Sequence, residues 1–255
     1  MINNFKGLMK IKKKQLYFTV LSVGVLVGAG TMWFTHHFRQ DSTMMQTYSE
    51  IIHPTSGDSL NLIDVPLESQ LKNDPLENGC EITSLSMLLR YYGFDTTKNQ
   101  LAKKLDYVPL ISADGFYGNP HKGFVGNIEE GYESMGVGVE PLAKVAKEIT
   151  GSNYQVKVST KKDFSEIEEQ VRAGVPVLVI TTVDFEVPTE DDLWDWETED
   201  GMITVSPLCH AVVITGIEGD TVYVNDPYGY RHREVDRDDF QSIYEKMGKQ
   251  SLYLE

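Results

Sequence analysis

The sequence predicts an α+β domain in which helices come before an antiparallel sheet. Apolar residues recur at helical spacing in the earlier part of the domain, at about 82–92, 98–105, 140–149 and 163–173. Apolar, β-branched segments separated by turn residues follow, from Val175 to Val224. Because helices followed by strands are typical of α+β proteins, we predict helices packed against one sheet.

The first 60 residues are predicted to attach this domain to a membrane. Residues 16–34 form a run of 19 uncharged, mostly apolar residues, which is long enough to cross a bilayer as a helix. Five lysines precede the run, and this positive flank places the N-terminus in the cytoplasm. We therefore predict a cytoplasmic tail at 1–15, an anchor at 16–34, an extracytoplasmic tether at 35–59 and the domain at 60–255. A cleaved signal peptide is the alternative, and it would make the protein secreted.

The charge balance argues against nucleic acid as a partner. Residues 1–40 contain six Lys or Arg and no acid, whereas residues 41–255 contain 17 basic and 38 acidic residues, a balance of −21. Proteins that bind phosphate backbones instead present basic surfaces. The six histidines lack metal-ligand spacing and the segment 190–201 lacks the calcium-loop pattern, so we expect no metal and no other cofactor.

A candidate nucleophile opens the first predicted helix. Cys80 follows Asn78-Gly79 and precedes an amphipathic pattern for which Gly93 is a plausible stop, so it falls at the N-cap or in the first turn. The unpaired N–H groups and the positive dipole end at that position favour a thiolate over a thiol. Taken alone, Cys80 is equally well explained as a buried small hydrophobe.

A predicted hairpin supplies a base for this thiol. Segments 209–215 and 221–225 have strand composition, with a turn between them. If the hairpin is centred on residue 218, His210 lies opposite Asp226, with their Cβ atoms about 5 Å apart on one face. The carboxylate would then fix the imidazole tautomer and leave the other ring nitrogen free to act on the thiol. A shift of one residue would turn Asp226 to the other face. The alternative is a structural histidine at the edge of the sheet, whose hydrogen-bonding needs are met by a nearby aspartate.

These segments resemble the papain-like cysteine peptidases related to the bacteriocin double-glycine leader peptidases. The likeness spans about 60–255 and rests on Val65–Gln70, on Asn78-Gly79-Cys80 with its helix, on Cys209–Val213 and on Asn225–Gly229. The resemblance implies a papain-like α+β fold with Cys80 as nucleophile, His210 as base and Asp226 as the orienting carboxylate. It also implies that the Gln70 side chain and the Cys80 N–H form the oxyanion hole. Ten residues separate Gln70 from Cys80, a longer spacing than in the leader peptidases themselves.

The second cysteine is predicted to have a packing role. Side chains alternate along a strand, so Cys209 points to the face opposite His210 and into the core, while Cys80 stays a free thiol. A Cys80–Cys209 disulfide is the alternative, and it would abolish thiol chemistry unless it were redox-regulated.

Two long loops are predicted to shape the substrate cleft. Residues 114–124 are rich in glycine and aromatic residues, and a similar segment occurs in the resembling family. Residues 186–207 carry two tryptophans among many acids and lead directly to Cys209. The predicted substrate contacts are Phe116, Tyr117, Phe124, Trp194 and Trp196. The alternative for both loops is local packing.

The sequence therefore predicts a membrane-anchored, extracytoplasmic cysteine peptidase that acts on peptides or proteins of the cell envelope through an acyl-thioenzyme. A transamidase or cell-wall amidase is an alternative, since a Cys-His-Asp triad does not choose between water and an amine as acceptor. A non-catalytic surface binding module is the other alternative, and the presence of all four predicted site residues argues against it.

Overall fold

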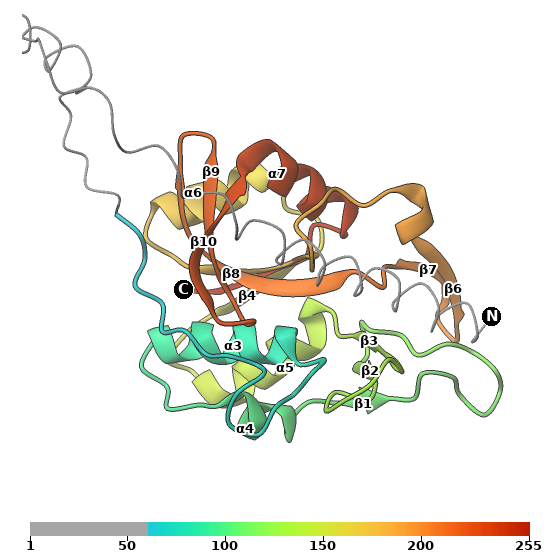
Figure 1. The fold of residues 1–255 in the computed structure, drawn as a ribbon. Coiled ribbons are helices and arrows are strands. Elements are labelled where there is room, and N and C mark those ends of the chain that lie inside the picture. The colour runs from blue at the N-terminus through green and yellow to red at the C-terminus, as the bar shows by residue number, and fades with distance from the viewer. Residues whose placement is uncertain (1–60) are drawn as a thin grey trace, which may run out of the picture. The chain divides into compact units, whose positions relative to one another are not determined.

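A six-stranded antiparallel sheet forms the centre of residues 61–255, which are the residues that the computed structural model describes (Figure 1). The strand order is β10-β9-β8-β5-β11-β4. The strands are β4 (Val156–Ser159), β5 (Val177–Thr182), β8 (Cys209–Glu218), β9 (Thr221–Asp226), β10 (Tyr230–Asp236) and β11 (Ser251–Leu254). Strand β5 is buried along its whole length, as expected for a central strand covered on both faces.

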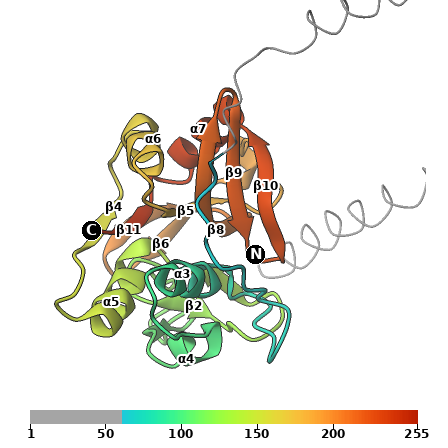
Figure 2. The ribbon, with the colours of Figure 1, turned by 90° about the vertical axis from the view of Figure 1, so that its left-hand side faces the viewer.

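Helices cover both faces of this sheet. Helices α3 (Cys80–Tyr91) and α5 (Val139–Thr150) lie on one face, with the short α4 (Lys98–Ala102) beside α3 (Figures 1 and 2). Helices α6 (Phe164–Arg172) and α7 (Arg237–Lys246) lie on the other face. In α3 every residue from Cys80 to Leu89 is buried, polar ones included, which marks it as a core helix. The chemistry of its first turn is therefore shielded from bulk water.

A smaller layer lies at one end of the domain. It consists of the sheet β1 (Tyr107–Val108), β2 (Phe124–Gly126) and β3 (Ser134–Gly136), together with the 3₁₀ turn η1 (Glu190–Asp192) and the hairpin of β6 (Trp194–Thr198) and β7 (Gly201–Val205). The loop between β1 and β2 joins the hairpin, because the Tyr117 N–H donates to the Glu197 carbonyl at 3.0 Å. The Tyr117 ring also stacks on Trp196, with centroids 4.3 Å apart.

The four predicted helices are confirmed, but strands are interleaved with them, because β1–β3 lie between α4 and α5 and β4 lies between α5 and α6. Helices stand where helical spacing indicated them, with α4 ending three residues earlier than expected. Beyond residue 225 the sequence analysis assigned no element, and the structure has β10, α7 and β11 there. The predicted tail (1–15), anchor (16–34) and most of the tether (35–59) lie outside the described residues. Within 61–255, no helix combines the length and the apolar character needed to cross a membrane.

Candidate active site

The loop that ends at Gly79 places Cys80 at the first residue of α3. The N-cap is Gly79, and a Cβ at that position would lie 2.6 Å from the Leu76 Cβ, so only glycine fits without displacement. The Asn78 side chain donates to the carbonyls of Asn127 and Gly131, at 2.8 and 3.1 Å. The Cys80 N–H therefore stands at the first helical position, where a helix provides no acceptor of its own.

Helix α3 is fixed against β8 at the residue that follows His210. The Ser84 hydroxyl, about one helical turn after Cys80, donates to the Ala211 carbonyl at 3.0 Å. This bond holds the start of the helix against the strand that carries His210, which lies 130 positions after Cys80 in the chain.

The hairpin that carries His210 and Asp226 has a different register from the predicted one. Glu218 pairs with Thr221 across a two-residue turn, not across the longer turn centred on residue 218. Continued without interruption, that register would pair Val213 with Asp226 and turn Asp226 away from His210. A bulge at Thr215 shifts the pairing by one, so Val213 lies opposite Asn225 and Asp226 returns to the His210 face. The predicted register is wrong, but the predicted His210–Asp226 pair is confirmed.

Asp226 fixes the tautomer of His210. The His210 Nε2 lies 3.0 Å from the Asp226 Oδ1, and both side chains are fully buried. Because an ionised carboxylate can only accept, Nε2 carries the proton and Nδ1 has the free electron pair. Nδ1 is buried and has no hydrogen-bond partner among residues 61–255. The ring thus keeps one basic nitrogen available on the strand that contacts Cys80.

Three donors keep Asp226 ionised in spite of its burial. Besides His210, the Tyr228 N–H donates to Oδ1 at 2.9 Å, and the Arg233 Nη1 donates to Oδ2 at 2.9 Å. Burial alone would raise the pKa of Asp226, but these hydrogen bonds outweigh it and hold the pKa below its ordinary value. The sequence analysis missed Arg233, because a bulge in β10 sets its position and no motif marks it.

Aromatic rings hold the imidazole in place. The Tyr228 ring stacks on His210 with centroids 5.0 Å apart, and Phe185 meets it edge-on at 6.3 Å. The Arg233 guanidinium lies 4.4 Å from the Phe185 ring centre. Phe185 has a φ of 59°, a left-handed conformation that non-glycine residues adopt only when their surroundings impose it. The orientation of His210 is therefore set by packing as well as by Asp226.

Gln70 lies between the nucleophile loop and the Asp226 turn. It is 1% exposed, and its backbone N–H donates to the Pro227 carbonyl at 2.8 Å. Its side-chain Nε2 donates to the carbonyls of Glu77 and Leu76, at 2.8 and 3.4 Å, while Oε1 has no partner within the described part of the chain. The predicted oxyanion donor is thus close to the loop of Cys80, with its amide hydrogens directed at backbone carbonyls.

A buried carboxyl group that the sequence analysis overlooked touches the nucleophile. The Glu81 Oε2 lies 3.2 Å from the Cys80 sulfur and accepts its S–H hydrogen bond. Burial raises the pKa of Cys80 well above its ordinary value, and the charge of Glu81 raises it further. The expectation that the helix N-terminus leaves a thiolate is therefore wrong for the free protein, because the helix dipole is outweighed by burial and by a neighbouring charge.

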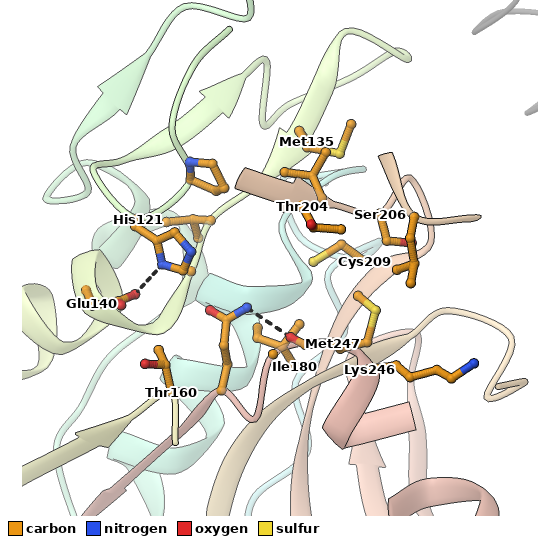
Figure 3. Close-up of a pocket in the computed structure, with 17 residues that line it drawn as sticks. His121, Met135, Glu140, Thr160, Ile180, Thr204, Ser206, Cys209, Lys246 and Met247 are labelled. Atoms are coloured by element: carbon orange, nitrogen blue, oxygen red, sulfur yellow. Dashed lines mark hydrogen bonds and ion pairs between the residues drawn. The ribbon is translucent and has the colours of Figure 1, made fainter. Parts of the chain in front are cut away.

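Cys209 packs against the core as predicted, but it is only half-buried and also lines a pocket. Cys80 and Cys209 are both free thiols, so the alternative of a disulfide is not realised. The Cys209 sulfur lies 4.0 Å from the Glu81 Oε1 and borders a pocket of about 430 Å³. Figure 3 shows Cys209 on one side of this pocket and the hydrogen-bonded pair His121–Glu140, 2.9 Å apart, on the other. The pocket therefore begins one residue from His210.

Residues 62–252 match the Peptidase_C39 like family. The chain belongs to this family. YvpB of Bacillus subtilis (strain 168), whose name assigns it no activity, is 40% identical over 193 residues, or 76% of this chain and 75% of that protein. The crystal structure of a candidate C39-like peptidase from Bacillus anthracis is 35% identical, with a TM-score of 0.72, and the match covers 77% of this chain and 96% of that one. The papain-like α+β fold class is thereby confirmed, and the family is of the cysteine peptidase kind.

A more distant structure adds nothing about the site. The peptidase domain of Streptococcus ComA, a bifunctional ABC transporter of a quorum-sensing pathway, is 13% identical, with a TM-score of 0.45. The match covers 74% of this chain and 97% of that domain. At this distance the likeness carries no argument about individual residues.

The predicted substrate contacts lie around the pocket of this C39-like domain without lining it. Phe124 is fully buried in the core and Trp196 is 4% exposed, so neither ring offers surface to a substrate. Phe116, Tyr117 and Trp194 are partly exposed, in two segments that pack on each other. Those segments instead contribute other lining residues, among them Pro120, His121, Leu193, Thr204 and Val205. Within 61–255, no three His, Cys, Asp or Glu side chains are grouped to hold a metal ion.

Proposed function

We propose that this member of the Peptidase_C39 like family is a cysteine peptidase with Cys80 as nucleophile, His210 as base and Asp226 as the orienting carboxylate. One observation carries the proposal. The His210 Nε2 is held by Asp226, and Nδ1 is left without a partner on the strand to which the first turn of α3 is bound. A base oriented by a third group and facing a nucleophile is the arrangement that activates a thiol.

The proposed reaction has two stages. In the first, the Cys80 proton passes to the His210 Nδ1 as the sulfur attacks the carbonyl carbon of the scissile bond. The tetrahedral intermediate then collapses, and the amine leaves with the proton from His210, which leaves a thioester on Cys80. In the second, water attacks the thioester carbonyl as His210 takes its proton. The second tetrahedral intermediate collapses with cleavage of the C–S bond, the carboxylic acid leaves, and His210 returns the proton to the Cys80 sulfur.

We propose that Gln70 stabilises the oxyanion together with the Cys80 N–H. Support comes from its burial and from the tie of its backbone to Pro227, which holds it between the nucleophile loop and the Asp226 turn. Its longer hydrogen bond, the one to the Leu76 carbonyl at 3.4 Å, is the one that an oxyanion would replace. A developing negative charge is a stronger acceptor than a neutral carbonyl, which favours the exchange.

Replacement of Cys80 tests the assignment. Cys80→Ala removes one sulfur atom, so we expect the melting temperature to change little while peptide hydrolysis and covalent labelling by a peptidyl thiol-reactive probe are lost. Cys209→Ser is the matched control for thiol labelling, in which the probe is expected to remain on Cys80. Hydrolysis that persisted in Cys80→Ala would contradict the proposal. Product analysis with an added amine distinguishes hydrolysis from transamidation.

We further propose that residues 16–34 anchor the protein and that the domain at 60–255 lies outside the cytoplasmic membrane. Support comes from the apolar run and from the lysines before it. Protease added to intact cells is expected to digest the domain and spare residues 1–15. A domain that is cut only after lysis would overturn this orientation. A mature chain that begins near Thr31 would instead identify a cleaved signal peptide and a secreted protein.

A further inference from the structure

The Glu81 carboxyl group is buried between the two cysteines without a cationic partner. Its side chain is 1% exposed, Oε2 accepts from the Cys80 thiol, and Oε1 accepts from the Val137 N–H at 3.1 Å. The Cys209 sulfur lies 4.0 Å from Oε1. Among residues 61–255, no lysine or arginine forms an ion pair with Glu81. An apolar side chain would be less costly to bury here, so stability does not explain Glu81.

The neighbouring backbone leaves room for this carboxyl group. A Cβ on Gly136 would lie 2.1 Å from the Glu81 Oε1, so any other residue at that position would displace Glu81. Gly136 also has a φ of +80°, a conformation that glycine adopts without strain. The end of β3 is therefore shaped to admit a carboxylate beside the nucleophile. A feature that costs stability and is accommodated so closely is expected to serve function.

We propose that Glu81 is a positioning residue that keeps the proton of Cys80 on sulfur and directed away from His210 in the free protein. This proposal rests on the proposed role of Cys80 as the nucleophile. No bond is made or broken in the resting state, in which the Cys80 thiol donates to the Glu81 carboxylate. When substrate displaces the contact, the thiol rotates and its proton passes to the His210 Nδ1.

The groups around the Cys80 thiol also favour a proton that stays on sulfur. Burial and the charge of Glu81 raise the pKa of Cys80, and the Ala211 N–H lowers it by a smaller amount. The other titratable groups that face this position are Cys209 and His210 on β8 and Tyr228 after β9. Burial raises the pKa values of both Cys209 and Tyr228, so both side chains stay neutral at physiological pH. Glu81 is thus the only anion in direct contact with the thiol among the described residues.

The consequence is a nucleophile with low reactivity until substrate binds. Thiolates, not thiols, are the species that alkylating and oxidising agents attack. A thiol that donates to Glu81 is therefore protected from modification in the free protein. The same contact agrees with the state of His210, whose Nδ1 has no partner among the described residues while the Cys80 thiol donates to Glu81.

The test is the pH dependence of Cys80 alkylation by iodoacetamide, followed by peptide mapping that resolves Cys80 from Cys209. Glu81→Gln keeps the shape of the side chain and an acceptor for the Val137 N–H. We expect at least about a tenfold increase in the alkylation rate of Cys80 at neutral pH, with a matching downward shift of the pH midpoint. Glu81→Met, which also lacks the charge, is expected to shift the midpoint in the same direction. Glu133→Gln, which removes an exposed carboxylate just before β3, is the matched control and should not shift it.

The outcomes separate this inference from the proposed activity. An unchanged midpoint in both Glu81 variants would overturn the role of Glu81, whatever the protein hydrolyses. A lowered midpoint in a protein that cleaves no peptide would support the role of Glu81 and count against the peptidase assignment. Alkylation is measured in the free protein, so the readout does not depend on turnover.

Discussion

Asp226 and Glu81 are two buried carboxyl groups in one site, and their surroundings shift their pKa values in opposite directions. Each is at most 1% exposed. Asp226 accepts from His210, Arg233 and the Tyr228 amide, and its pKa is lowered. Glu81 accepts from a thiol and one backbone amide, and burial raises its pKa. Burial is common to both, so the number and charge of the donors decide the direction of each pKa shift.

In the proposed mechanism the two groups act at different steps. Asp226 bonds to Nε2 of His210, the proposed base, and holds one tautomer of its ring. Glu81 accepts from Cys80, the proposed nucleophile, and opposes its ionisation. Under this proposal Asp226 prepares His210 to accept a proton, and Glu81 sets how readily Cys80 gives one up.

The largest expected difference between the two carboxylates is in activity. Asp226→Asn keeps the size of the side chain but can stabilise the wrong imidazole tautomer, so we expect kcat to fall roughly 10³- to 10⁴-fold. Glu81→Gln is expected to retain far more activity, since it leaves the His210–Asp226 pair intact. Steady-state hydrolysis of a peptide by both variants checks the contrast. Equal losses in the two would show that the carboxylates act as one unit.

Gln70, the proposed oxyanion donor, is a third buried polar side chain of the site, and its replacement tests how the oxyanion is stabilised. Gln70→Ala is expected to lower kcat about 10²-fold, the usual effect of losing one oxyanion donor. The KM should change less, because the donor acts on charge that develops after binding. Kinetics with amide substrates, alongside melting curves, distinguish this from a structural effect. A loss of stability without loss of kcat per folded molecule would assign Gln70 to loop packing alone.

The smallest effect is expected in the pH dependence of folding stability, where the two carboxylates have opposite signs. The pKa of Glu81 is raised in the folded state, so its contribution is favourable at low pH and is lost as pH rises from about 4.5 through the raised value. The pKa of Asp226 is lowered, so its contribution is present above about 3.8 and is lost as pH falls through the folded value.

Urea unfolding of the wild type and Glu81→Gln between pH 4 and pH 8 measures this difference. In the variant, position 81 does not titrate, so its free energy of unfolding should rise relative to that of the wild type as the pH is raised across that range. A relative stability that is constant across the range would show that Glu81 has the same pKa in the folded and unfolded states.

The hairpin shows how far a sequence pattern can be taken. Strand composition and turn residues located both strands, and the predicted His210–Asp226 pair is present. The register came out differently because the turn has two residues and Thr215 forms a bulge. The Thr215 hydroxyl donates to the Tyr223 carbonyl at 3.2 Å, and its carbonyl accepts from the Ile63 N–H at 2.7 Å. That second bond comes from a segment about 150 residues earlier, which no local pattern contains.

By itself, the sequence determined the α+β class, the placement of Cys80 at a helix start and the two strands that carry His210 and Asp226. These features follow from periodicity, turn residues and the chemistry of each residue type, all of which are local. Only the tertiary structure decided the bulge that turns Asp226 to the His210 face, the support of Asp226 by Arg233, the burial of Phe124 and Trp196 and the raised pKa of Cys80. Those outcomes depend on burial and on partners distant in the chain, because ionisation responds to every charge and dipole within a few ångströms regardless of sequence order.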